Sequence, residues 1–324
     1  MSPVPSYDVL VAGLGPAGLA AALALNGLGL RVAAAGLAPG RGHDPRATAL
    51  MPPSLTLLER LGVWQHCARH AQPMTGLRLI DATGRLLRAP ESIFYAKELS
   101  RDQFGACIAN GRLLEALTGV ARSRSGLTLL ETDGFRSIDV GHRTVEMTLA
   151  DGQRLTAPLL VGADGRHSPA RAAAGIASQA WSYPQTALAL TFRHARPHGG
   201  VSIEFHRASG PLTTVPLPGN VSSLVWVETP AEAQRLLTLE PADLARTLRT
   251  ALHNCLGRIE DIAACVAYPL SAMRADRLAQ RRTALVGEAA HVIPPIGAQG
   301  LNLGLRDVAC LADAVEDARD AGRA

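Results

Sequence analysis

The stretch YDVLVAGLGPAGLAAALALNGLGLRVAAAG, residues 7–36, decides the fold of this 324-residue chain. It opens with an apolar run rich in β-formers, and an alanine- and leucine-rich segment follows as far as Leu28. The run from Arg31 to Ala35 is apolar again. This order predicts a βαβ unit, with Pro16 in the first turn of the helix, where a missing N–H loses no hydrogen bond.

A G-x-G-x-x-G motif, made of Gly13, Gly15 and Gly18, lies between the predicted strand and the predicted helix. Glycines at these positions let backbone N–H groups approach a pyrophosphate at the positive end of the helix dipole. Because the motif stands between a strand and a helix, it predicts dinucleotide binding. Pro16 and Ala17 complete the predicted binding turn.

The acidic residue that binds the adenosine ribose in such folds is missing. It is expected about 20 residues beyond the motif, where this sequence reads Ala35-Gly36-Leu37. Water could meet the ribose instead, or Arg41 or Arg46 could act through other atoms of the nucleotide. The residues do not decide between these alternatives.

Further along the chain, leucines at helical spacing predict amphipathic helices over Pro53–Trp64 and Asn110–Val120. Alternating stretches between Leu127 and Ala163 are separated by glycine-containing turns and predict a meander of strands. The last of these stretches, residues 159–163, is typical of a buried strand.

After Gly175, longer strand-like runs with turns rich in proline and glycine predict a second, mainly antiparallel sheet. The runs are Ala187–His194, Val201–His206, Leu212–Pro216 and Ser222–Glu228. Helices after Pro230 and Pro241, a buried strand over Thr283–Gly287 and a closing helix over Leu301–Ala318 complete the prediction. The predicted fold class is α/β, with a Rossmann-like dinucleotide-binding domain of residues 1–75, 101–175 and 271–324 and a mainly antiparallel β-sheet domain of residues 76–100 and 176–270.

Composition narrows the function. The net charge is +4, but Lys97 is the single lysine, the arginines are scattered and 4% of residues are aromatic, which argues against nucleic-acid binding. The five cysteines are odd in number and form no CxxC pair, so we expect a reducing, cytoplasmic setting. His66, Cys67 and His70 alone suggest a metal site, and an exposed helix end is the favoured interpretation. Neither a signal peptide nor a membrane-spanning run is predicted.

Two more motifs follow predicted strands. Residues 162–168 read GADGRHS, and residues 287–302 read GEAAHVIPPIGAQGLN. With the first motif, and in this order, they resemble the flavoprotein aromatic hydroxylases of the para-hydroxybenzoate hydroxylase type. Residues 181–187, 210–212 and 224–226 are similar to the ubiquinone-biosynthesis branch, which includes 2-polyprenyl-6-methoxyphenol hydroxylase. The resemblance covers essentially the whole chain, and it implies that relatives continue beyond the position of Ala324 with helices that cover the substrate side.

By this resemblance the cofactor is FAD, and the three glycines of the first motif hold its pyrophosphate. Arg46 and Arg112 reach FAD from flanking elements; the alternative for both is a surface ion pair. Asp164 and Gly165 lie near the pyrophosphate, where the family also brings NADPH or NADH.

The third motif is implied to contact the ribityl chain and the flavin ring. Glu288, after Gly287, stands where the family has an aspartate bonded to the ribityl chain, and the longer side chain is expected to weaken FAD by about tenfold or less. A helix beginning near Gly300 would direct its N–H groups toward the pyrimidine end of the flavin. The residues implied to border the isoalloxazine are Pro295, Gly297, Gly300, Leu301 and Asn302.

The implied reaction is the hydroxylation of a phenolic ring, with a hydrophobic polyprenyl phenol of ubiquinone biosynthesis as the expected substrate. NAD(P)H reduces FAD, O2 adds to the reduced flavin, and the resulting hydroperoxide hydroxylates the ring. His206, His291 and Tyr183 are candidates for a base that deprotonates the phenol, and none is assigned.

Partners and rival functions are left open by the sequence. Peripheral contact with the inner face of the membrane, a biosynthetic complex and a homo-oligomer are each compatible with it. A flavin-dependent oxidase or reductase that does not hydroxylate, and a flavin-binding scaffold without turnover, stay as alternatives. A halogenase would be expected to carry a Trp-x-Trp-x-x-Pro segment, which this sequence lacks.

Overall fold

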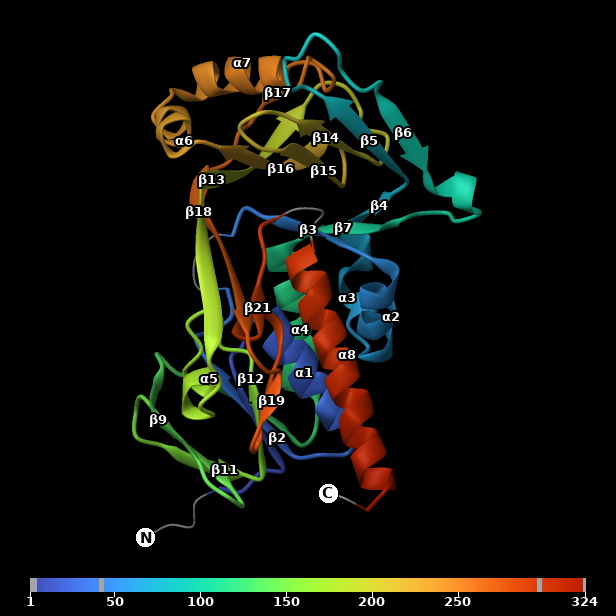
Figure 1. Cartoon of the computed structure of the whole chain (residues 1–324). Coiled ribbons are helices and arrows are strands. Elements are labelled where there is room, and N and C mark those ends of the chain that lie inside the picture. The colour runs from blue at the N-terminus through green and yellow to red at the C-terminus, as the bar shows by residue number, and fades with distance from the viewer. Residues whose placement is uncertain (1–4, 41–43, 296–298, 323–324) are drawn as a thin grey trace.

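The computed structural model describes residues 5–40, 44–295 and 299–322, and it has two parts stacked one above the other (Figure 1). The lower part in this view holds a mainly parallel sheet with its helices. The upper part holds a large, mainly antiparallel sheet. This confirms the predicted α/β class with a second sheet domain.

A six-stranded sheet in the order β19-β20-β12-β1-β2-β8 forms the centre of the lower part. β1 is parallel to both β2 and β12, so the first βαβ unit lies in the middle of the sheet. β1 and β2 are buried throughout, as a parallel sheet covered on both faces requires. The strands are β1 (Val9–Ala12), β2 (Val32–Gly36), β8 (Leu127–Glu131), β12 (Leu159–Gly162), β19 (Ala279–Gln280) and β20 (Thr283–Leu285).

The prediction of a strand meander between Leu127 and Ala163 is confirmed only for its middle part. There β9 (Phe135–Val140), β10 (Val145–Leu149) and β11 (Arg154–Ala157) form a separate antiparallel sheet. β8 and β12 instead join the parallel sheet, beside β2 and β1. The long connection from β2 to β8 ends in a helix that packs beside α1, and a crossover of this kind brings in a parallel strand.

α1 (Pro16–Gly27) lies against the parallel sheet, and α4 (Asn110–Ser123) and α8 (Gln299–Asp320) pack beside it (Figure 1). Their apolar faces meet in one hydrophobic cluster, in which Leu19 and Leu117 are fully buried. α8 therefore closes the lower part as the sequence predicted, and it brings the end of the described chain back onto the first helix.

The helix predicted over Pro53–Trp64 is two helices. Gly62 has a φ of +72°, a left-handed conformation that ends the first helix, and the second starts at Trp64. The remaining helices include the two predicted after Pro230 and Pro241. They are α2 (Pro52–Arg60), α3 (Trp64–Cys67), α5 (Pro169–Ala173), α6 (Pro230–Leu237), α7 (Pro241–Ala251) and the short 3-10 helices η1 (Ala68–His70), η2 (Ala96–Leu99) and η3 (Gly287–Ala289).

The upper sheet runs in the order β21-β18-β13-β16-β15-β14-β5-β6, with β17 paired to β13, and a three-stranded sheet β3-β7-β4 lies at the junction with the lower part (Figure 1). The upper strands are β5 (Gly76–Asp81), β6 (Ser92–Tyr95), β13 (Ser178–His194), β14 (Val201–His206), β15 (Leu212–Leu217), β16 (Val221–Glu228), β17 (Ile259–Glu260), β18 (Val266–Ala275) and β21 (His291–Val292). The junction strands are β3 (Ala47–Leu50), β4 (Ala71–Met74) and β7 (Gly105–Ala109).

β13 is the longest strand and connects the two parts (Figure 1). It pairs with β18 over Ser178–Ser182, shifts register, and pairs with β18 again from Thr186. The sequence predicted only its second half, because the first half is exposed and carries no apolar alternation. The division into domains at residues 75, 100, 175 and 270 stays a prediction, since β13 and β18 run along both parts.

Two glycines of α1 provide a matched test of this packing. A methyl group added at Gly18 would lie 2.1 Å from the carbonyl oxygen of Gly13, whereas no described residue outside the helix backbone and the chain neighbours lies within 4 Å of one added at Gly27. Gly18→Ala is therefore expected to destabilise the flavin-free protein by about 1–3 kcal/mol, and Gly27→Ala to be neutral or stabilising by up to about 1 kcal/mol. Thermal unfolding of both variants measures this, and equal melting temperatures would contradict the close packing at Gly18.

Candidate active site

The G-x-G-x-x-G turn is closely packed on its inner side. Gly13 has a φ of +117°, and a methyl group added there would lie 2.2 Å from the carbonyl oxygen of Ala163. A methyl group added at Gly18 would lie 2.1 Å from the carbonyl oxygen of Gly13. Both glycines are therefore required by the packing of β1 and α1 against the turn after β12, whatever the turn binds.

Gly15, by contrast, is not required by the fold. Its φ of −74° and ψ of 175° suit any residue, and no described residue apart from its chain neighbours lies within 4 Å of a methyl group added there. It begins α1, and Pro16 occupies the first turn. The turn thus keeps open space at the positive end of a 12-residue helix, which fits the pyrophosphate of a dinucleotide such as FAD.

The end of β2 also lies against this turn. A methyl group added at Gly36 would lie 2.9 Å from the backbone nitrogen of Leu14 and 3.0 Å from the Cα atom of Gly13. A larger residue at this position, such as the missing acid, would therefore require the turn to shift. Two arginines were considered in place of the missing acid. Arg41 lies outside the described residues, and Arg46 already donates a hydrogen bond to the Asp44 carboxylate.

Arg46 belongs to a polar cluster that the sequence analysis did not identify. Its Nε and Nη2 atoms donate to the two carboxylate oxygens of Asp44 at 2.7 and 2.8 Å, and its guanidinium lies 5.0 Å from the ring centre of Tyr268. The Asn110 side chain donates to the same carboxylate at 3.0 Å. The hydrogen bond to Asp44 raises the pKa of Arg46, and the charge of Glu288 contributes further. Arg46 and Glu288, predicted from distant motifs, are thus electrostatic neighbours.

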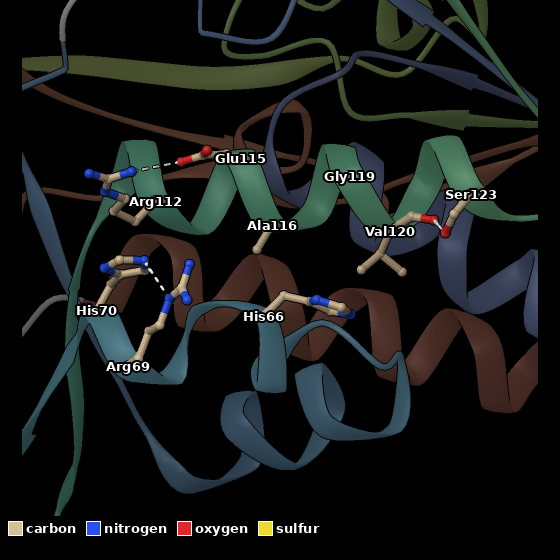
Figure 2. Close-up of a pocket in the computed structure, with 9 residues that line it drawn as sticks. All are labelled: His66, Arg69, His70, Arg112, Glu115, Ala116, Gly119, Val120 and Ser123. Atoms are coloured by element: carbon tan, nitrogen blue, oxygen red, sulfur yellow. Dashed lines mark hydrogen bonds and ion pairs between the residues drawn. The ribbon is translucent and has the colours of Figure 1, made fainter.

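Arg112 faces a different surface. It forms an exposed ion pair with Glu115 at 3.1 Å, which is the alternative that the sequence left open. Figure 2 shows it at the rim of a groove of about 480 Å³ that also contains His66 and His70. The structure does not bring Arg112 into contact with Arg46. Asn110, which bonds Asp44 in the Arg46 cluster, lies two residues before Arg112 at the start of the same helix.

His66 and His70, two of the three residues considered as a metal site, line the same groove. Cys67, between the two histidines in sequence, is buried and donates to a backbone carbonyl at 3.8 Å. Desolvation raises its pKa to about 11, which disfavours the thiolate that binds metals. In the described part of the chain no group of three His, Cys, Asp or Glu side chains could hold a metal ion.

Asp164 of the second motif stabilises the turn that faces Gly13. Its carboxylate accepts hydrogen bonds from the Ser168 hydroxyl and, at 2.8 Å, from the Ala170 N–H at the start of α5. Burial raises the pKa of Asp164, and these hydrogen bonds oppose the rise. Gly165 follows with a φ of +85°, and no described residue other than its chain neighbours lies within 4 Å of a methyl group added there. The second motif therefore has a packed side and an open side, as the first does.

The third motif packs on the first. A methyl group added at Gly287 would lie 3.1 Å from the Cβ atom of Ala17. Asp307 on α8 fixes this contact, since one of its carboxylate oxygens accepts from the Gly287 N–H at 2.9 Å and bonds the Nε2 atom of His291 at 2.7 Å. That hydrogen bond, together with the charge of Asp307, raises the pKa of His291.

Glu288 is accessible. Its side chain is 54% exposed, and its carboxylate lies 3.8 Å from the Nε atom of Arg166 in the second motif. The three motifs therefore meet at one place: the first contacts the second at Ala163, the third contacts the first at Ala17, and Glu288 connects the third to the second. A carboxylate left accessible here is suited to bind hydroxyl groups, as the ribityl chain of FAD would require.

Asn302, predicted to border the flavin ring, has a side chain with a structural role. Its side chain is buried, accepts hydrogen bonds from the Met51 N–H at 2.9 Å and the Ser54 hydroxyl at 2.7 Å, and donates to the Ala49 carbonyl at 2.8 Å. It thereby ties α8 to β3 and α2. Of the other residues expected at the ring, Gly297 lies outside the described residues, Pro295 and Gly300 are exposed, and Leu301 is half-buried.

A small pocket of about 120 Å³ lies between the upper sheet and the loop that follows β21. Tyr183 and Gln185 supply its polar groups. Apolar side chains form the rest of its lining: Pro211, Val227, Leu270, Pro294 and Pro295. The pocket thus connects β13, β16 and β18 to Pro295, the residue expected at the flavin ring. Of the three candidate bases, Tyr183 alone lines the described pocket. His291 is hydrogen-bonded to Asp307 at 2.7 Å, and His206 lies 3.3 Å from Glu204.

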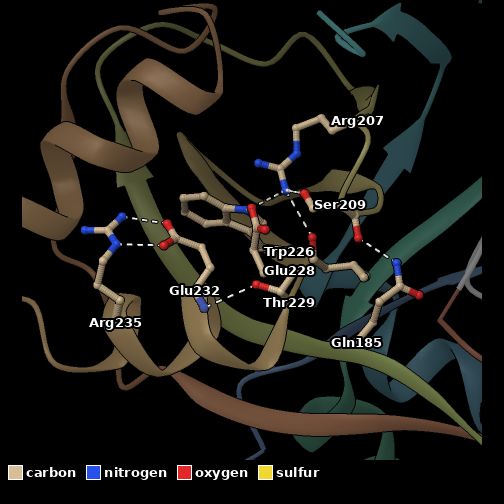
Figure 3. A network of polar contacts seen from close by, with 9 residues as sticks. Gln185, Arg207, Ser209, Trp226, Glu228, Thr229, Glu232 and Arg235 are labelled. Atoms are coloured by element: carbon tan, nitrogen blue, oxygen red, sulfur yellow. Dashed lines mark hydrogen bonds and ion pairs between the residues drawn. The ribbon is translucent and has the colours of Figure 1, made fainter.

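A buried ion pair lies beside Val227 of this pocket, in the polar network that Figure 3 shows. Arg207 donates to Glu228 at 2.5 Å and to the carbonyl oxygen of Val227 at 3.0 Å, and Trp226 donates to the same carboxylate at 2.9 Å. Gln185 is fixed by a hydrogen bond to a neighbouring carbonyl oxygen at 2.5 Å. These bonds order the wall formed by β16 and the β14–β15 turn, which contain residues 224–226 and 210–211 of the segments that resemble the ubiquinone-biosynthesis branch.

Comparisons with known proteins identify the family of this chain. Residues 6–318 match the family described as FAD binding domain. Ubiquinone hydroxylase UbiL of Rhodospirillum rubrum is 35% identical over 321 residues, covering 97% of this chain and 73% of that protein. The 3-demethoxyubiquinol 3-hydroxylase of Escherichia coli is 32% identical over 282 residues, covering 87% and 71% of the two chains.

A solved structure of the same shape is a mutant of PqsL from Pseudomonas aeruginosa, with a TM-score of 0.82 and 25% identity over 98% of this chain and 88% of that one. The family match spans nearly the whole chain, and it includes all three motifs that meet at the Gly15 turn. This chain therefore belongs to the FAD-binding family of flavoprotein monooxygenases.

Proposed function

We propose that this FAD-dependent monooxygenase hydroxylates the ring of a polyprenyl phenol in ubiquinone biosynthesis, with NADPH or NADH as reductant. Two observations support the proposal: the open space beside Gly15 at the start of α1, and an apolar pocket that Pro295 and one phenolic side chain, Tyr183, line. The names of the relatives, a ubiquinone hydroxylase and a 3-demethoxyubiquinol 3-hydroxylase, support the substrate class.

Each part of the site has a role in this proposal. FAD, when bound, supplies the acceptor for hydride from NAD(P)H and the site of O2 activation. The Gly15 turn and the N-terminus of α1 bind the pyrophosphate, and Glu288 binds the ribityl hydroxyls. The pocket beside Pro295 holds the aromatic ring and excludes water from it. Tyr183 contacts the phenol oxygen, and its own hydroxyl accepts a hydrogen bond from Trp181 at 2.9 Å.

The membrane is a proposed partner, because a polyprenyl chain partitions into lipid. No described helix is long and apolar enough to cross a membrane. The attachment that we propose is interfacial. Association with other enzymes of the pathway and self-association stay predictions.

Substitution of Gly15 by valine separates cofactor binding from folding. Because the space beside Gly15 is open, Gly15→Val should unfold at the temperature of the flavin-free wild type, yet its side chain would occupy the pyrophosphate position. We expect FAD affinity to fall by at least about a hundredfold, equivalent to about 2.7 kcal/mol. Fluorescence titration with FAD measures the affinity.

Gly119→Val is the matched control, since Gly119 is an exposed glycine of α4 with equally open space. It should bind FAD as the wild type does. Unchanged FAD affinity in Gly15→Val would show that the pyrophosphate lies elsewhere.

The length of the Glu288 side chain is a second test. Glu288→Asp places the carboxylate at the distance that the family residue provides and should tighten FAD by up to about tenfold, the contribution of one hydrogen bond. Glu288→Ala should weaken FAD without lowering the melting temperature, because the side chain is largely exposed. FAD titration of both variants decides the matter, and equal affinities in wild type, Glu288→Asp and Glu288→Ala would remove Glu288 from the site.

A further inference from the structure

The loop between β5 and β6, residues 84–90, carries two adjacent leucines that the fold leaves in solvent. Leu86 is 98% exposed and Leu87 is 88% exposed. Figure 1 shows this loop at the upper limit of the molecule, far from the lower part that contains the Gly15 turn. A single exposed leucine needs no explanation, but two neighbours at the tip of a loop indicate a contact surface.

The tip is held in shape from below. The Asp81 carboxylate accepts hydrogen bonds from the hydroxyl and N–H of Thr83 at 2.6 and 3.0 Å, and from the Ala89 N–H at 3.0 Å. The hydrogen bonds from Thr83, and then that from Ala89, lower the pKa of Asp81 to about 2. Arg78 and Glu91 close the base of the hairpin with hydrogen bonds of 2.7 and 2.9 Å. The two leucines therefore lie at the tip of a turn that these hydrogen bonds stabilise.

Positive charge surrounds the tip. Arg85 and Arg88 flank the two leucines directly, both are exposed, and neither forms an ion pair with any described residue. The loop residues 84–90 contain two cationic side chains, Arg85 and Arg88, and no acidic one, which gives the tip a net charge of +2. Because Glu91 is already paired with Arg78, the charge at the tip itself is positive.

The adjoining strand continues the surface. β6 is the edge strand of the upper sheet, and its consecutive residues Phe94 and Tyr95, which point to opposite faces of the strand, are 47% and 45% exposed. Tyrosine is favoured at the boundary between water and lipid, where its apolar ring and its hydroxyl are both satisfied.

We propose that residues 84–95 form a docking surface for an anionic lipid bilayer, with Leu86 and Leu87 entering the boundary layer and Arg85 and Arg88 contacting lipid phosphates. Leucines bracketed by arginines match a layer whose apolar interior lies beneath negative headgroups, because the arginine stems can bury while their charges stay at the surface. The proposal rests on the proposed function in one respect: binding to the bilayer would give the enzyme access to a substrate that is dissolved in lipid.

Flotation of the full chain with vesicles tests the surface. The wild type should float with vesicles of equal parts phosphatidylcholine and phosphatidylglycerol, and less with phosphatidylcholine alone. Leu86→Ser with Leu87→Ser, and separately Arg85→Gln with Arg88→Gln, should each lower partitioning by about tenfold or more. Added salt should weaken binding of the leucine variant and the wild type alike, because screening acts on the charges.

A matched control uses the exposed pair Arg277 and Leu278, which lies outside the hairpin; Leu278 is 55% exposed. Arg277→Gln with Leu278→Ser should float as the wild type does. The proposal is overturned if the wild type binds neither vesicle, if the loop variants bind as well as it does, or if the control loses binding equally. A change of oligomeric state in the loop variants with unchanged flotation would also overturn it, and would assign the surface to a second copy of the chain.

Flotation requires neither bound FAD nor turnover. Loss of hydroxylation with intact lipid binding would therefore refute the proposed function alone, and the reverse result would refute the docking surface alone.

Discussion

The close approach of three backbone turns around Gly13 is the constraint on which the site depends. Gly13 lies against the carbonyl oxygen of Ala163, Gly18 lies against Gly13, and Gly287 lies against Ala17. No side chain fits between these turns, so segments separated by more than a hundred residues are held at backbone contact distance. Gly15 is the exception in the same turn, because its open side faces away from the packing.

Much of this could be predicted from the sequence, because local patterns carry it. The βαβ unit, the closing helix and the antiparallel runs of the upper sheet follow from periodicity and glycine turns. The parallel pairing of β8 and the first half of β13 could not, since both depend on neighbours distant in sequence. Among the site residues, the contacts that hold Arg112 and Asn302 within the chain could not be predicted from a motif: Arg112 pairs with Glu115, and the Asn302 amide hydrogen-bonds with α2 and β3. The contacts of both residues with FAD stay predictions.

The departures of the sequence from its family have physical consequences at two positions. At Gly36 the missing acid coincides with a turn that lies too close to β2 for a larger side chain. At Glu288 the carboxylate is present, accessible and paired loosely with Arg166. Cofactor affinity is therefore expected to come mainly from the pyrophosphate turn, and substrate specificity from the pocket that the Arg207–Glu228 pair supports.

Anaerobic reduction of the FAD-loaded protein by NADPH, with and without a prenylated phenol, followed by admission of O2, tests the central claim most directly. The account predicts that the flavin absorbance bleaches, that it bleaches faster with the phenol present, and that O2 then yields the hydroxylated ring. A protein that cannot be loaded with FAD, or one that oxidises NADPH without forming hydroxylated product, would contradict it.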